Sequence, residues 1–220
     1  MSDLKALIFD VDGTLAETEE LHRAAFNQAF AAAGLAIVWD GARYRELLGT
    51  TGGKRRILRH FAEAGMPPDE VLAQQLHSSK NVHYAEAVAV GVEFRPGVVD
   101  LIQRASRAGL QLAIATTTSR SNLSALLAGA GLPAFEVIVA GEDVSTLKPH
   151  PEVYLRTLEQ LQIAPGEALA FEDSANGLKS ASAAGLRTIV TPSLYSAGED
   201  FAAAVAVLPD LTDFDWERWA

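Results

Sequence analysis

The chain has 220 residues, a formal net charge of −10 and 49% hydrophobic residues, values typical of a soluble globular protein with one or two domains. The acidic balance argues against nucleic-acid binding, and the lack of cysteine excludes disulfides, thiolate metal sites and cysteine nucleophiles. No apolar run is long enough for a membrane span and the N-terminus has no signal-peptide pattern, so we expect a cytoplasmic protein with no membrane or nucleic-acid partner.

The first predicted element is a buried strand over residues 6–9, which ends abruptly in the acidic turn Asp10-Val-Asp12-Gly13. Because side chains alternate along an extended chain, Asp10 and Asp12 leave the same face about 7 Å apart. Carboxylates at the carboxyl end of a strand lie where open α/β sheets bind ligands. Holding two of them close together is costly unless a cation or the chemistry of a substrate uses them.

Residues 17–92 carry only helical patterns. The spacing of apolar residues predicts helices over residues 18–33, 40–48, 54–64 and 69–89, with Thr18 or Glu17 as a candidate cap of the first and Asp69 as the cap of the last. Because this block directly follows the acidic turn, we expect it to form a cap over the carboxyl end of the first strand.

From Arg95-Pro-Gly97 onward, strand patterns alternate with helical ones, which predicts parallel βαβ units. The domain division that follows is 1–16 with 93–220 for an α/β core and 17–92 for a helical cap. The tail tryptophans Trp216 and Trp219 are expected to pack on the core. Strands are predicted over residues 112–115, 137–140, 168–171, 188–190 and 205–208, and helices over 98–108, 121–128, 151–161 and 174–184.

Three later segments place polar residues at or near strand ends. Thr116 opens a threonine cluster suited to a phosphate, Lys148 precedes a proline turn, and Glu172 and Asp173 follow an apolar strand. Taken alone, each segment has a purely structural explanation: a threonine-rich turn, a surface lysine, or acids at a helix start. Together with Asp10 and Asp12 they predict one site with hard oxygen ligands, which suits Mg²⁺ and phosphoryl transfer.

The sequence Asp-Val-Asp-Gly-Thr at 10–14, Thr116, the lysine of Lys-Pro and Glu-Asp-Ser at 172–174 resemble, in order, the four motifs of the haloacid dehalogenase superfamily, phosphatase branch. The resemblance implies a Rossmann-like parallel-sheet core with an inserted all-helical cap. It implies that Asp10 is a nucleophile that forms an aspartyl-phosphate and that Asp12 is the acid and base. Thr116 and Lys148 would complete the catalytic set. The Asp10 carboxylate, the Asp12 carbonyl and Asp173 would hold Mg²⁺, with Glu172 acting through water.

The presence of Asp12 favours phosphoryl transfer, because dehalogenases of this superfamily lack that second carboxylate. Substrate recognition depends on weaker signals. Gly52, Gly53 and Lys54 at a helix start could hold an anion, and His77 and Lys80 share one helix face. A solvated polar surface explains His77 and Lys80 about equally well.

These details resemble the sugar-bisphosphate phosphatases that hydrolyse xylulose 1,5-bisphosphate, an inhibitory by-product of the Calvin cycle enzyme rubisco. A β-phosphoglucomutase-like mutase and a broader sugar-phosphate phosphatase are the alternatives; the mutase carries an arginine where this chain has Gly52-Gly53. The complete catalytic set argues against a non-catalytic sugar-phosphate sensor. We expect a monomer that binds a small sugar phosphate. The predicted substrate contacts are Glu17, His22, Thr50, Thr51, Gly52, Gly53, Lys54, His77, Lys80, Thr117, Thr118, Arg120 and Asn122.

Overall fold

A computed structural model of the protein describes residues 4–219, which divide into two compact units. The core unit holds residues 4–17, 93–120 and 129–219, and the helical unit holds 18–92 and 121–128. The predicted division into 1–16 with 93–220 and 17–92 stays a prediction, and its residues 1–3 and 220 lie outside the described residues.

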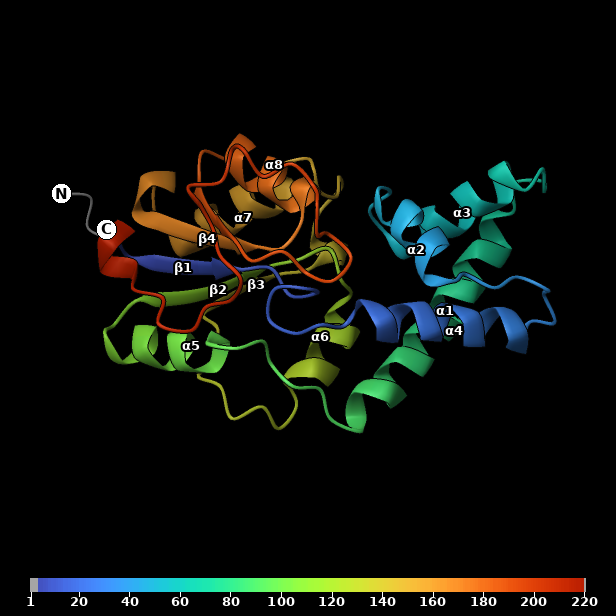
Figure 1. The fold of residues 1–220 in the computed structure, drawn as a ribbon, viewed down its shortest axis with the longest axis horizontal. Helices are drawn as coiled ribbons and strands as arrows, with labels where there is room; N and C mark the ends of the chain where they lie inside the picture. Colours follow the sequence, from blue (N-terminus) through green and yellow to red (C-terminus); the bar gives the residue numbers. More distant parts are fainter. Residues whose placement is uncertain (1–3, 220) are drawn as a thin grey trace. The chain divides into compact units, whose positions relative to one another are not determined.

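The core unit is a parallel sheet with helices on both faces (Figure 1). Short 3₁₀ helices at Gly141–Asp143, Pro165–Glu167 and Trp216–Trp219 join or end its elements. Its strands and helices are β1 (Ala6–Phe9), α5 (Val98–Arg107), β2 (Gln111–Ala115), β3 (Val137–Val139), α7 (Glu152–Leu161), β4 (Ala168–Glu172), α8 (Ala175–Ala183), β5 (Arg187–Val190) and β6 (Ala206–Val207).

Within residues 4–219, six strands pair in the order β3-β2-β1-β4-β5-β6, and every pairing is parallel. The predicted α/β fold class is therefore confirmed, and β1 has the predicted bounds. Ile8 pairs with Ala113 on one side and with Ala170 on the other, so β1 is central. The strand order reverses between β1 and β4, and such a reversal is the place where open α/β sheets bind their ligands.

Side chains alternate between the two faces of the sheet and make two apolar layers. Ile8 and Ala170 belong to the layer that packs under α7 and α8, whereas α5 covers the opposite face (Figure 1). On that opposite face the rings of Phe9 and Phe171 stack with centroids 4.7 Å apart, and Phe214 meets Phe171 edge-on. The tail is therefore anchored by buried Phe214, whereas the tryptophans expected to pack on the core, Trp216 and Trp219, are half-buried.

The helical unit forms around one aromatic core. The rings of Phe26, Phe30 and Tyr44 surround Trp39, whose main chain exchanges two hydrogen bonds with the Asn27 amide. All four rings are buried, and aromatic side chains bury large apolar areas, so their packing stabilises the unit. Its elements are α1 (Glu19–Ala32), α2 (Gly41–Leu48), α3 (Gly53–Glu63), α4 (Glu70–Ala89) and most of α6 (Arg120–Leu127).

Local capping chemistry sets several of these helix starts. Asp40 accepts the Arg43 N–H at the start of α2, and Asp69 accepts the Leu72 N–H at the start of α4. Thr18 is the N-cap residue of α1 but makes no side-chain capping bond within the described chain. Among residues 4–219, no helix combines the length and the apolar character needed to cross a membrane.

Candidate active site

The hydrogen-bond ladder of the sheet continues past the strand ends and fixes the polar residues that follow. The Asp10 N–H donates to the Phe171 carbonyl at 3.0 Å, and the Thr116 N–H donates to the Val139 carbonyl at 3.0 Å. These bonds hold the carboxyl end of β1 in register with that of β4, and the end of β2 in register with that of β3. Polar residues from distant parts of the sequence meet at this edge.

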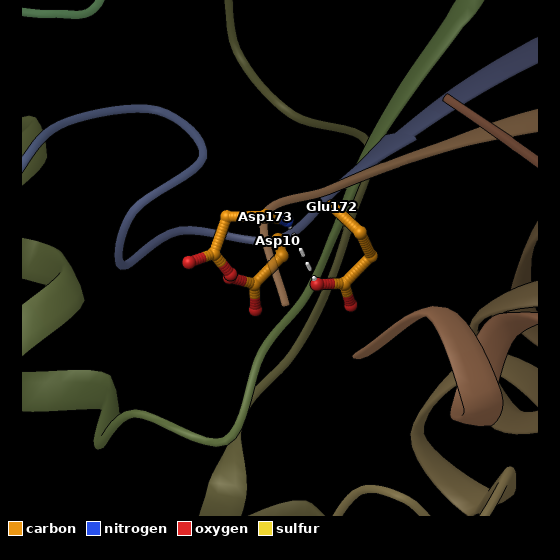
Figure 2. A group of neighbouring side chains, drawn as sticks. All are labelled: Asp10, Glu172 and Asp173. Atoms are coloured by element: carbon orange, nitrogen blue, oxygen red, sulfur yellow. Dashed lines mark hydrogen bonds between the residues drawn. The ribbon is translucent and has the colours of Figure 1, made fainter. Parts of the chain in front are cut away.

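Asp10, Glu172 and Asp173 form a buried acidic group at the ends of β1 and β4 (Figure 2). One carboxylate oxygen of each residue lies within 4.8 Å of the other two. Such crowding of like charges is unfavourable unless a cation neutralises it. The structure therefore brings together three of the four carboxylates that were predicted to share one site.

Lys148 supplies a protein cation at the centre of this group. Its ammonium donates to Asp10 Oδ1 at 2.6 Å, to Glu172 Oε1 at 2.7 Å and to the Ala115 carbonyl at 2.9 Å. These three bonds match the three N–H donors of the ammonium, which fixes its position. Burial disfavours the charged form, but Asp10 and Glu172 outweigh burial and raise the pKa of Lys148 above its ordinary value.

The same environment also raises the pKa of Asp10, which disfavours the charged form of this residue, whereas it favours the charged form of Lys148. Burial raises the pKa of Asp10 to about 7; the Lys148 charge lowers it, while Glu172 and Asp12 raise it further. The carboxylate thus gains or loses its proton near neutral pH, and added positive charge beside it favours the ionised form. An ionised, partly desolvated carboxylate suits attack on phosphorus.

Glu172 is held by protein groups on both of its oxygens. The Tyr154 hydroxyl donates to Oε1 at 2.5 Å, and the Asp173 N–H donates to Oε2 at 3.3 Å. A Cβ on Gly177 would lie 1.8 Å from Oε2, so only glycine fits the start of α8 at this point. The position of the Glu172 carboxylate is therefore tightly determined.

Asp173 is supported through its main chain by the segment after β5. Ser196 Oγ donates to the Asp173 carbonyl at 2.6 Å, and Ser193 N–H donates to Ser196 Oγ at 2.8 Å. The side chain lies against Gly13, where a Cβ would be 2.3 Å from Asp173 Oδ2. Gly13 also has a φ of 82°, so glycine is required there for both space and conformation.

The remaining predicted residues of the core unit surround this acidic group or lie on loops. Asp12 is half-buried beyond Asp10, and buried Thr116 accepts the Thr118 N–H through Oγ1 at 3.2 Å, with Thr117 between them. Glu17 and Arg120 are engaged with protein partners. Glu17 lies 3.5 Å from the Arg95 guanidinium, and Arg120 forms an ion pair with Asp143.

The helical unit gathers several other predicted residues into a cationic cluster. The Lys80 ammonium lies 2.6 Å from Nδ1 of His22, and both are buried. The Tyr84 ring stacks on His22 with centroids 4.0 Å apart, and Lys80 lies 4.9 Å from the centre of that ring. Burial, followed by Lys80, His22, Arg56 and Lys54, lowers the pKa of nearby His77 to about 4. The cluster thus concentrates positive charge.

Other predicted residues of the helical unit have structural partners. Lys54 pairs with Glu70 at 2.8 Å, and Thr50 Oγ1 accepts from Arg59 at 3.2 Å. Asn122 donates to the Asn81 side chain at 3.2 Å. The predicted anion-binding turn begins α3: Gly52 is its N-cap with a φ of 97°, Gly53 lies against the His77 ring, and Thr51 precedes them, half-buried.

Sequence reasoning missed three supporting residues, namely Tyr154, Arg95 and Ser196. Tyr154 lies on the buried face of α7, six residues after Lys148. A buried tyrosine hydroxyl needs a hydrogen-bond partner, and this requirement could have indicated its contact with Glu172. Arg95 and Ser196 act on main-chain carbonyls, and such contacts leave no pattern in a sequence.

The donor set fits a hard divalent cation. Asp10 and Asp173 offer carboxylate oxygens, and histidine and cysteine are absent from the group of acids that could hold a metal within the described chain. Glu172 already accepts hydrogen bonds from Lys148 and Tyr154. Oxygen-only donors of this kind suit Mg²⁺.

The family model "Haloacid dehalogenase-like hydrolase" matches residues 7–191. A protein CbbY of Rhodobacter capsulatus is 54% identical over 96% of this chain and 95% of its own length. Crystal structures of CbbY from Rhodobacter sphaeroides, one with phosphate and one of the D10N mutant with xylulose-(1,5)bisphosphate, are each 46% identical. They superpose with TM-scores of 0.90 and 0.91, and each match covers 96% of both chains. The chain therefore belongs to the haloacid dehalogenase-like hydrolase family and is an enzyme of its phosphatase kind.

Proposed function

We propose that the protein is a Mg²⁺-dependent phosphatase of a sugar bisphosphate, xylulose 1,5-bisphosphate, and that it works through an aspartyl-phosphate. The observation that carries the proposal is the buried group of Asp10, Glu172 and Asp173 with Lys148 bonded to two of them. The choice of sugar is supported by the relative crystallised with that bisphosphate, which resembles this chain over nearly its whole length.

In the proposed reaction, Asp10 attacks the phosphorus atom and the bond from phosphorus to the sugar oxygen breaks. The leaving oxygen takes a proton from Asp12, which returns to its carboxylic acid form by taking a proton from water as that water attacks the phosphorylated Asp10. Inorganic phosphate leaves and Asp10 is restored. Lys148 holds Asp10 in place through the bond at 2.6 Å and balances charge during attack.

Asp10, the Asp12 carbonyl and Asp173 would hold Mg²⁺, with Glu172 acting through water. When bound, the cation would supply positive charge for the phosphoryl oxygens and favour the ionised form of Asp10. The remaining predicted contacts would recognise the sugar and its second phosphate. In the helical unit, the positive charge of Lys80 and of nearby Arg56 supports a role in binding an anion.

The test is a phosphate-release assay across sugar monophosphates and bisphosphates, with Mg²⁺ and with a chelator. We expect release to require Mg²⁺ and to be fastest with xylulose 1,5-bisphosphate. D10N should abolish release while the protein stays folded, because an amide cannot form the phosphoenzyme. D100N, which alters an exposed aspartate on α5 paired with Arg104, is the matched control and should keep full activity. Hydrolysis by D10N near the wild-type rate would reject the mechanism.

The panel also separates the alternatives. A mutase would release little phosphate and would depend on a bisphosphate to regenerate its phosphorylated form. A broader phosphatase would show comparable kcat/KM values for several sugars.

A further inference from the structure

The side chain of Arg95 makes an unusual set of contacts inside the core unit. The side chain is 9% exposed, and its guanidinium donates to four main-chain carbonyls, those of Gly13, Thr191, Pro192 and Pro209. The bonds to Thr191 and Pro192 are 2.6 and 2.9 Å long, and the Pro209 contact is 3.5 Å. Three separate stretches of the chain thus meet on one cation.

The backbone of Arg95 is fixed to the acidic turn as well. Its N–H donates to the Leu15 carbonyl at 2.8 Å, and the preceding Phe94 forms an antiparallel bridge with Ala16. Ala16 also forms a bridge with Asp12, and its carbonyl accepts the Gly13 N–H at 2.8 Å. The turn that carries Asp12 is therefore held from its backbone side by residues 94 and 95.

Gly13, which follows Asp12 directly, contacts Arg95 and Asp173. Its carbonyl accepts from Arg95, and its Cα lies so close to Asp173 that a Cβ would be 2.3 Å from Oδ2. With its φ of 82°, the residue cannot be replaced without strain. Arg95 fixes the Gly13–Thr14 peptide through its carbonyl, and Ala16 fixes the Asp12–Gly13 peptide through the Gly13 N–H, so the turn that carries Asp12 is held on both sides of Gly13.

We propose that Arg95 is a positioning residue for Asp12: it fixes the acidic turn through the Gly13 carbonyl and anchors it to the loop after β5. This inference rests on the proposed function, in which Asp12 gives its proton to the leaving oxygen. The five N–H donors of a guanidinium lie in a rigid plane, so one arginine can donate to four carbonyls in a fixed arrangement, whereas the ammonium of a lysine has three donors and does not match that planar fork.

A role of Arg95 in positioning Asp12 predicts unequal losses of activity on two kinds of substrate. A sugar oxygen is a poor leaving group and needs a proton as its bond to phosphorus breaks, whereas a nitrophenolate leaves without one. A displaced Asp12 should therefore harm hydrolysis of the sugar phosphate far more than hydrolysis of p-nitrophenyl phosphate. General loss of folded protein would harm both equally.

The experiment compares kcat/KM for xylulose 1,5-bisphosphate and p-nitrophenyl phosphate in the wild type, R95M and R95K. We expect R95M to lose about 100-fold on the sugar phosphate and about tenfold or less on the aryl phosphate, in line with the usual worth of a general acid. R95K should show the same bias, and if R95M does not fold, R95K provides the ratio. Guanidinium ions at millimolar concentration should restore part of the sugar-phosphate activity of R95A.

R104M and R104K are matched controls, because Arg104 also binds a main-chain carbonyl, that of Phe214 at 2.7 Å, and a carboxylate on α5. They should leave both kcat/KM values unchanged. Equal losses on the two substrates in folded R95K would overturn the positioning role while leaving the phosphatase intact. A wild type that releases phosphate from neither substrate would reject the proposed function, and this role with it.

Discussion

His77 makes the helical unit sensitive to acid, and replacing it with glutamine should remove much of that sensitivity. The half-buried ring lies against Gly53, and burial together with Lys80, His22, Arg56 and Lys54 lowers its pKa from 6.5 to about 4. Between those values the unfolded chain binds a proton at His77 and the folded chain does not. The unfolded state then binds more protons, so the free energy of unfolding rises with pH across this window and falls as acid is added.

The size of the effect follows from the two pKa values. With 6.5 unfolded and about 4 folded, His77 should cost the folded state about 2 kcal/mol between pH 7 and pH 5. This is an upper figure, because water reaches part of the ring and screens the neighbouring charges. H77Q keeps a polar side chain of similar reach but has no proton to gain. Its loss of stability over the same pH range should be smaller by up to about 2 kcal/mol.

The measurement is urea unfolding at pH 7 and pH 5, followed by Trp39 fluorescence. Trp39 is buried in the helical unit, and changing Trp216 and Trp219 to phenylalanine leaves it as the only tryptophan of the three. H83Q, which removes a half-buried histidine from the same helix, is the matched control. An H77Q protein that loses as much stability in acid as the wild type would refute the reasoning.

Two further substitutions probe the acidic group. K148M removes the cation from between two buried carboxylates, so we expect the free energy of unfolding, measured in the presence of a chelator, to fall by about 3 to 5 kcal/mol. Mg²⁺ should restore part of that loss. K179M, which changes an exposed lysine on α8, is the control, and equal stability of the two variants would contradict the expectation. G177A forces the Glu172 carboxylate to move, because the new Cβ would lie 1.8 Å from Oε2, and we expect the rate of phosphate release to fall at least about tenfold. G166A is the control: its new methyl group meets no atom within 4 Å, so its release rate should stay at the wild-type level.

The strands and their polar ends were predictable because the signals are local. The apolar run of β1 stops at Asp10, and the same pattern recurs before Glu172, so the period and the abrupt change of residue type indicated both strand and site. Parallel pairing then brings the ends together, since all carboxyl ends of a parallel sheet lie at one edge. Lys148 lies in the loop between β3 and α7, so its contact with these acids does not follow from strand pairing alone.

Partners that come from distant loops were not predictable. Arg120 was expected to bind a phosphate, but in the structure it pairs with Asp143, more than twenty residues further along the chain. Lys54 likewise pairs with Glu70 on another helix. A basic residue beside an anion-binding turn looks the same in sequence whether it binds a ligand or an acid of its own chain. Tertiary structure shows the acids of the chain that pair with Arg120 and Lys54, and the contact of these two residues with a substrate stays a prediction.

The place of β1 in the sheet also bears on how the chain reaches its folded form. Its two neighbours are residues 111–115 and 168–172, so the middle of the sheet is built from segments that are very far apart in sequence. A ribosome adds roughly 5–20 residues per second, so β1 waits on the order of ten seconds for β4 to emerge. Both edges of this apolar strand are open until β2 emerges, and one edge stays open until β4 follows, which allows pairing with other chains and makes nascent or truncated forms candidates for binding by chaperones.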